Sequence, residues 1–144
     1  MSGNSSKSEL VFIDTNILLY AYDYSEVVKQ AKAEALLSEL WQRRTGCISI
    51  QVLQEFYVNA TRKLSTPLDV PTARQVVADY SRWIVHVPTS ADVLDAIDLQ
   101  QANKLSFWDA MILQSALTLG CKLLWSEDLN LGQRFADLEL QTPF

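Results

Sequence analysis

Short apolar runs alternate along the chain with longer stretches in which apolar residues recur at helical spacing. The short runs are typical of buried strands, because they are rich in Val, Ile and Leu and end at polar or turn residues. They cover Leu10 to Ile13, Cys47 to Ile50, Ile84 to Val87 and Lys122 to Trp125, with a weaker one at Leu138 to Gln141. The pattern therefore predicts short strands separated by helices.

The helical stretches carry recognisable start and stop signals. The first predicted helix begins at Ile17. The next three cover Ser25 to Arg44, Gln51 to Leu64 and Pro71 to Trp83. The last two run from Thr89 and Ser90 to about Leu105 and from Ser106 through Leu119. Thr45 and Gly46 mark the end of the longest helix. Pro71 suits a helix start, Ser106 is a capping residue, and Gly120 is a stop signal.

Strands that alternate with helices form a parallel sheet with helices on both faces. We therefore predict an α/β protein, a three-layer α/β/α sandwich with a short parallel sheet of four to five strands. The chain has 144 residues, 49% of them hydrophobic, which suits one compact domain. We assign residues 9 to 144 to this domain and the Ser-rich residues 1 to 8 to a flexible N-terminal tail.

Two further features bear on the compartment. No apolar stretch approaches the roughly 20 residues that cross a bilayer, and the opening lacks the apolar run of a secretory signal. We expect a cytoplasmic protein without a membrane segment. Cys47 and Cys121 sit in apolar runs without a neighbouring His or a CxxC spacing, so we expect them to pack in the core rather than form a disulfide or bind zinc.

The formal net charge of −5 is unexpected for a protein that binds nucleic acid, because phosphate binding relies on Lys and Arg. A site built from carboxylates would account for part of this charge, and divalent cations would neutralise it. Basic residues remain available for local contacts with phosphate. They are Arg43, Arg44, Arg62, Lys63, Lys104, Lys122 and Arg134.

Four of the seventeen acidic residues stand at unusual places in the apolar pattern. Asp14 and Asp128 follow predicted strands, whereas Glu55 and Asp109 lie near the starts of predicted helices. Each one alone has an ordinary explanation as a helix cap, a first-turn acid or an exposed side chain. A buried carboxylate costs several kcal/mol unless it is paired, hydrogen-bonded or metal-bound. Together the four predict an all-oxygen cluster at the carboxyl edge of the sheet, which suits Mg²⁺ or Mn²⁺.

Other polar residues give weaker indications. Asp92, Asp95 and Asp98 have apolar neighbours that predict a buried stripe, so we expect the three aspartates to form one solvated helix face. His86 is the sole histidine, and we identify no Ser or Cys partner for a nucleophilic triad. The tryptophans favour packing or an oligomer interface, except that Trp108, beside Asp109, is a candidate for stacking on a base.

The four acids occur in segments that resemble the motifs of PIN domains. Val11 to Leu18 resembles the opening strand with its acid, Ser49 to Phe56 the segment of the helical glutamate, and Leu105 to Ile112 the third motif. Leu123 to Leu129 resembles the fourth motif, in which a Ser or Thr precedes the last acid by two positions. The similarity runs from about Leu10 to Phe144, and its final part, from Asn130, is similar to bacterial VapC-like toxins.

This resemblance implies an endoribonuclease that hydrolyses RNA phosphodiester bonds with Mg²⁺ or Mn²⁺ and leaves 3′-hydroxyl and 5′-phosphate ends. The catalytic metal ligands would be Asp14, Glu55, Asp109 and Asp128. We favour Asp128 over its neighbour Glu127 as the fourth acid because of its motif position. Asn16 and Ser126 are candidates for orienting water or a ligand carboxylate, and loop capping explains them equally well.

The VapC-like resemblance also implies the toxin of a toxin–antitoxin pair, a homodimer, and an antitoxin that inserts Arg or Lys into the acidic pocket. One alternative is a PIN-type RNA-processing nuclease without an antitoxin. A catalytically silent PIN-like binding module is another, although the presence of all four acids argues against it. A third is a phosphatase with Asp14 as covalent nucleophile, but Asn16 stands where its second aspartate is normally found.

Overall fold

The computed structural model describes residues 9–129 and 132–144, so the predicted N-terminal tail lies outside the described residues. Its strands are β1 (Val11–Ile13), β2 (Gly46–Ser49), β3 (Ile84–His86), β4 (Leu123–Trp125), β5 (Arg134–Phe135) and β6 (Leu138–Gln141). They form one sheet in the order β3-β2-β1-β4-β6-β5. All neighbours are parallel except β5, which pairs antiparallel with β6.

In the described part of the chain the sheet has six strands, so the prediction of four to five was wrong. The strand without a counterpart in the predictions is β5, which has only two residues and is too short to carry an apolar pattern. It is a strand because it forms a tight hairpin with β6, with Ala136 in a left-handed backbone conformation (φ 54°) at the turn.

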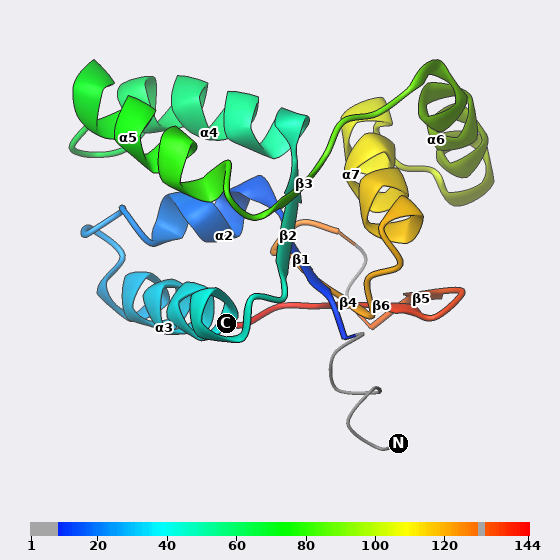
Figure 1. Cartoon of the computed structure of the whole chain (residues 1–144), viewed down its shortest axis with the longest axis horizontal. Coiled ribbons are helices and arrows are strands. Elements are labelled where there is room, and N and C mark those ends of the chain that lie inside the picture. Colours follow the sequence, from blue (N-terminus) through cyan, green and yellow to red (C-terminus); the bar gives the residue numbers. More distant parts are fainter. Residues whose placement is uncertain (1–8, 130–131) are drawn as a thin grey trace.

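The helices pack in two layers, one on each face of the sheet. They are α2 (Thr15–Tyr20), α3 (Val27–Arg43), α4 (Ile50–Arg62), α5 (Val70–Tyr80), α6 (Ser90–Asn103) and α7 (Phe107–Thr118). Figure 1 shows α2, α3, α4 and α5 on one side of the sheet and α6 and α7 on the other. This is the three-layer α/β/α sandwich that the alternating pattern predicts. No helix within the described ranges combines the length and apolar character required to cross a bilayer.

Local capping explains why the helices begin close to where the sequence predicts. The Asp14 side chain accepts a hydrogen bond from the Thr15 N–H at the start of α2, and Ser49 caps α4 in the same way. Ser106 caps α7, as predicted. Side-chain caps satisfy backbone N–H groups that have no partner within the helix, so they fix the first turn locally. These caps place Asp14 and Asp109 at helix starts near the sheet edge.

Gly46 has a different role from the predicted one. Helix α3 ends at Arg43, its C-cap residue Arg44 adopts a left-handed conformation (φ 58°), and Gly46 is the first residue of β2. A Cβ atom at Gly46 would lie 2.5 Å from the indole ring of Trp83. The glycine is therefore required because the ring packs directly on the β2 backbone. The thiols of Cys47 and Cys121 are buried and free, as predicted.

Candidate active site

Four acidic side chains converge at the carboxyl edge of the sheet. Because β1 and β4 are parallel neighbours, Asp14, which follows β1, lies beside the segment after β4 that carries Asp128. Glu55 belongs to α4 and Asp109 to the first turn of α7. Burial is the main cause that raises the pKa values of Asp14 and Asp109; the charges of Asp109 and Glu55 add to the rise at Asp14, and those of Asp128 and Glu55 add to the rise at Asp109. The fold thus brings together the acids that the sequence singled out.

Asp14 is the most deeply buried of the four, with 7% of its surface exposed. Desolvation is the main cause that raises the pKa of Asp14 to about 6. Hydrogen bonds from the Ser126 hydroxyl (2.9 Å) and the Thr15 N–H (2.7 Å) oppose this rise in pKa. Burial also raises the pKa of the half-buried Asp109, although a side-chain hydrogen bond with Ser106 partly offsets the effect. The folded protein therefore holds two carboxylates whose charge is unfavourable without a cation.

Glu55 is held by two residues that the sequence analysis missed. The Thr15 hydroxyl donates a hydrogen bond of 2.6 Å to Glu55 Oε1, and Gln51 Nε2 donates one of 3.1 Å to Glu55 Oε2. Gln51 also donates to the backbone oxygen of Trp108, which ties α4 to the start of α7. The helical spacing of Gln51 and Glu55 was visible in the sequence, because residues four apart share a helix face. The hydrogen bond from Gln51 to Trp108 was not visible in the sequence, because the two residues belong to different helices.

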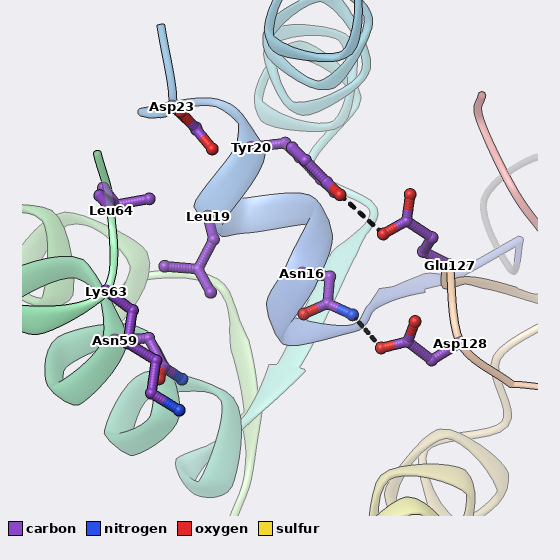
Figure 2. Close-up of a pocket in the computed structure, with 9 residues that line it drawn as sticks. All are labelled: Asn16, Leu19, Tyr20, Asp23, Asn59, Lys63, Leu64, Glu127 and Asp128. Carbon is purple, nitrogen blue, oxygen red and sulfur yellow. Dashed lines mark hydrogen bonds between the residues drawn. The ribbon is translucent and has the colours of Figure 1, made fainter. Parts of the chain in front are cut away.

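Ser126 and Asn16 organise the segment that carries Asp128. The fully buried Ser126 hydroxyl donates to Asp14 Oδ2 and accepts hydrogen bonds from the backbone N–H groups of Asp128 (3.2 Å) and Leu129 (3.3 Å). Asn16 Nδ2 donates to Asp128 Oδ2, as Figure 2 shows. Both residues thus contact a candidate ligand carboxylate directly, which is the arrangement expected of residues that orient such ligands.

Glu127 and Asp128 point to different partners although they are adjacent in sequence. Glu127 accepts hydrogen bonds from Lys29 Nζ (2.6 Å) and the Tyr20 hydroxyl (2.7 Å), whereas Asp128 faces Asn16 (Figure 2). Burial raises the pKa of Glu127, but the bonds from Lys29 and Tyr20 outweigh it and leave the pKa lowered. Glu127 is thus already neutralised by a lysine. This arrangement favours Asp128 as the fourth acid of the cluster.

The cluster offers only oxygen ligands, the donors that hard cations such as Mg²⁺ and Mn²⁺ take up. Within residues 9–129 and 132–144, no three Asp, Glu, His or Cys side chains are grouped tightly enough to form a ready-made metal site. Like charges without a cation are expected to stay apart. Mg²⁺ commonly uses one or two carboxylates and completes its shell with water, so this donor set fits the ion chemically.

His86 has a serine partner, contrary to the sequence analysis. Its Nδ1 lies 2.8 Å from the Ser115 hydroxyl, and its Nε2 lies 3.3 Å from Asp92 Oδ2. All three side chains are buried, and Ser115 is 1% exposed, so no substrate reaches this hydroxyl. Asp92 also forms a capping box with Thr89 at the start of α6. The group joins α6, α7 and β3 as a structural element, not as a nucleophilic triad.

The expectation of one solvated aspartate face on α6 was therefore wrong for Asp92. Asp95 and Asp98 are exposed, but so are Leu94 (63%) and Ile97 (40%), which were expected to be buried. Helix α6 packs mainly on α7 and leaves these apolar side chains on its outer surface. The apolar residues on nearly every side of α6 made the inward face ambiguous, because helical periodicity alone could not select it.

Comparison with known proteins assigns this architecture to a family. The family model described as the PIN domain matches residues 11–136, which include all four acids. The chain therefore belongs to the PIN domain family. No curated protein matches this chain in sequence.

Several solved structures share the fold at low sequence identity. A toxin-antitoxin complex from Klebsiella pneumoniae has a chain that is 19% identical, with a TM-score of 0.67 and coverage of 93% of this chain and 98% of that chain. VapC20 of Mycobacterium tuberculosis, described as a Sarcin-Ricin loop cleaving toxin, is 17% identical, with a TM-score of 0.62 and coverage of 82% and 89%. VapBC2 from Rickettsia felis, bound to a promoter DNA fragment, is 16% identical, with a TM-score of 0.66 and coverage of 92% of this chain and 98% of that chain.

Proposed function

We propose that this PIN-domain protein is a Mg²⁺- or Mn²⁺-dependent endoribonuclease and the toxin of a toxin–antitoxin pair. The observation that carries the proposal is the convergence of Asp14, Glu55, Asp109 and Asp128 at one edge of the sheet, with the pKa of the buried Asp14 raised to about 6. The similar fold of VapC20, described as a toxin that cleaves the Sarcin-Ricin loop, supports RNA as the substrate class.

The four acids are the residues that would hold the metal. When bound, a divalent ion supplies charge neutralisation of the scissile phosphate and a lowered pKa of water for attack on phosphorus. Asp14 is kept in place by Ser126 and by the Thr15 N–H, and Glu55 by Thr15 and Gln51. Such hydrogen bonds orient ligand carboxylates before substrate arrives. The exposed ring of Trp108 (60%), beside Asp109, offers a surface on which a base can stack.

The proposal also includes an antitoxin that inserts Arg or Lys into the acidic cluster. The Klebsiella and Rickettsia structures are described as a toxin-antitoxin complex and as VapBC2, which supports such a partner. An Arg side chain can pair with two carboxylate oxygens at once, and it would occupy the place of the metal. At matched ionic strength, antitoxin affinity should therefore fall as Mg²⁺ rises, measured by titration calorimetry. A homodimer remains a prediction, to be tested by light scattering.

The test of the enzymatic proposal is cleavage of a mixed RNA by the purified protein, followed by sequencing of the RNA ends. We expect cleavage with Mg²⁺ or Mn²⁺, none in excess EDTA, and 5′-phosphate and 3′-hydroxyl ends. Asp109→Asn, purified in parallel, is the control for contaminating nucleases. Cleavage that persists in EDTA, or in Asp109→Asn, would overturn the proposal. Binding of RNA without any cleavage would support the silent binding module instead.

A further inference from the structure

A cavity of about 430 Å³ lies directly beside the acidic cluster. Asn16 and Asp128 form one wall, and they belong to the candidate site as well. The opposite wall comes from the end of α4, with Asn59 and Lys63, and Figure 2 shows Leu19 of α2 between these two walls. The volume lies within the range of pockets that enclose small ligands. Anything bound here would be adjacent to a phosphate held at the cluster.

The polar groups of this cavity divide into those that are already paired and those that are free. Asp23 accepts hydrogen bonds from the N–H and hydroxyl of Ser25, and Glu127 is paired with Lys29. The side-chain amide of Asn59 has no hydrogen-bond partner in the described part of the chain, and it is half-buried. The Asn59 amide is therefore available to a ligand in the cavity.

Lys63 is exposed and forms no ion pair with any described residue. By contrast, several of the basic residues that the sequence offered for phosphate contacts are paired with acids. These pairs are Arg43 with Glu39, Lys122 with Asp137, and Arg134 with Glu139. Among the candidates, Lys63 lines the cavity beside the acidic cluster. It is thus placed to contact a phosphate next to one at the cluster.

This combination of groups matches an unstacked nucleotide. RNA is read in single strands by amides that bond to base edges, by apolar contacts with base faces, and by cations on flanking phosphates. Asn59 supplies both a donor and an acceptor, Leu19 supplies an apolar surface, and Lys63 supplies the cation. An Arg or Lys side chain of a protein partner would be attracted by Asp23 and Asp128 but repelled by Lys63, and it would leave the Asn59 amide without a complementary base edge.

We propose that the cavity between α2 and the end of α4 is a nucleotide subsite that holds the residue next to the scissile phosphate of RNA. Asn59 reads the edge of its base, and Lys63 pairs with the flanking phosphate. The inference deepens the proposed ribonuclease function and rests on it. It adds a source of sequence preference that the acidic cluster alone does not provide.

The first experiment compares cleavage preferences on an RNA with a randomised tract. We expect the wild-type protein to prefer one or two bases at a position next to the cut, and Asn59→Ala to weaken that preference about fivefold or more, the loss typical of one good base contact. Gln54→Ala, an exposed amide of the same helix, is the matched control and should keep the wild-type preference. An unchanged preference in Asn59→Ala would overturn the subsite while leaving the ribonuclease proposal intact.

A second variant tests the phosphate contact. Lys63→Gln should raise KM several-fold at an unchanged kcat and reduce the slope of log KM against log salt by about one. Lys122→Gln, on the opposite edge of the sheet and paired with Asp137, serves as the control and should change neither. A loss confined to kcat, or a salt slope equal to that of the wild type, would contradict the assignment of Lys63.

Binding without cleavage separates the subsite from the proposed function. The four nucleoside 5′-monophosphates are titrated into the protein in metal-free buffer at low salt, and the side-chain amide of Asn59 is followed by NMR. We expect it to shift with at least one nucleotide and the shift to weaken in Lys63→Gln. If no nucleotide shifts the Asn59 amide signal, or if only an arginine-containing peptide shifts it, the cavity is not a nucleotide subsite.

Discussion

The Ser126 hydroxyl, directly after β4, donates a hydrogen bond of 2.9 Å to Oδ2 of Asp14, directly after β1, across 112 positions of sequence. The same oxygen accepts hydrogen bonds from the N–H groups of Asp128 and Leu129. One buried hydroxyl therefore connects the most buried acid of the cluster to the segment that carries the fourth acid. The contact exists because the ends of two parallel neighbours meet at the same edge of the sheet.

We predict that Ser126→Ala lowers the free energy of unfolding by about 1–3 kcal/mol, because it removes one of the two hydrogen bonds to Asp14 and leaves two backbone N–H groups without their acceptor. Cleavage should fall by about 10–100-fold, as is typical when a group that orients a metal ligand is lost. Urea denaturation and initial cleavage rates measure the two effects.

A double-mutant cycle with Asp14→Asn assigns the cause. The loss of unfolding free energy caused by Ser126→Ala should be smaller in the Asp14→Asn background than in the wild type, with a coupling energy of at least about 0.5 kcal/mol. Strict additivity of the two substitutions would mean that the hydroxyl acts only on the backbone of its own loop.

We predict that stability depends on pH through Asp14. Its folded pKa of about 6 lies above 3.8, the ordinary value of an aspartate, so the folded chain binds this proton more tightly than the unfolded chain does. The stabilisation is present at pH values below about 4 and is lost as the pH rises through 6. Between these pH limits the free energy of unfolding of the wild type should fall by up to about 3 kcal/mol relative to that of Asp14→Asn, both in metal-free buffer.

Urea titrations of both proteins between about pH 4 and pH 7 check this prediction, because carboxylates outside the acidic cluster titrate similarly in both proteins and cancel in the difference. Added Mg²⁺ should recover the loss in the wild type at neutral pH by binding the ionised carboxylates. Parallel pH profiles for the two proteins would show that the buried carboxyl does not titrate in this range.

We predict that Asp109→Asn reduces cleavage by at least about 100-fold, since a ligand should matter no less than the groups that orient it. The metal-free protein should remain as stable as the wild type or become more stable, because Asp128 and Glu55 both repel the Asp109 carboxylate. Thermal melts with and without Mg²⁺ measure this. Asp95→Asn, exposed on α6, is the control and should behave like the wild type. A large loss of stability in Asp109→Asn would assign Asp109 a structural role.

We predict that the two adjacent acids after β4 respond differently to neutralisation. Asp128→Asn should lower cleavage by about 100-fold or more, as expected for a ligand. Glu127→Gln loses a partly exposed ion pair with Lys29, which is worth no more than about 1 kcal/mol, so its rate should stay within about fivefold of the wild type. Cleavage rates and the stabilisation of thermal melts by Mg²⁺ measure both. If Glu127→Gln is the more damaging change, the fourth acid is Glu127.

Much of the fold could be predicted because local chemistry decided it. Ser106 caps α7 through a bond that spans three residues, and the apolar run after Cys121 forms β4 as expected. Such signals depend on neighbours in the sequence, so the sequence alone contains them. Asp14 and Asp128 were found in the same way, as acids that end apolar strands. Their convergence followed from the rule that functional groups gather beyond the carboxyl ends of parallel strands.

Tertiary structure decided the rest, because the deciding partners are far apart in the sequence. Glu127 is engaged by Tyr20 and Lys29, which lie 107 and 98 positions away, whereas Asp128 is engaged by Asn16. His86 meets Ser115 from another element, so the pairing had no local signature. The sequence by itself determined which residue types occupy strand ends and helix starts, since hydrophobic period and capping are local. The fold decided which of those residues face one another, because that depends on strand order and on the packing of helices against the sheet.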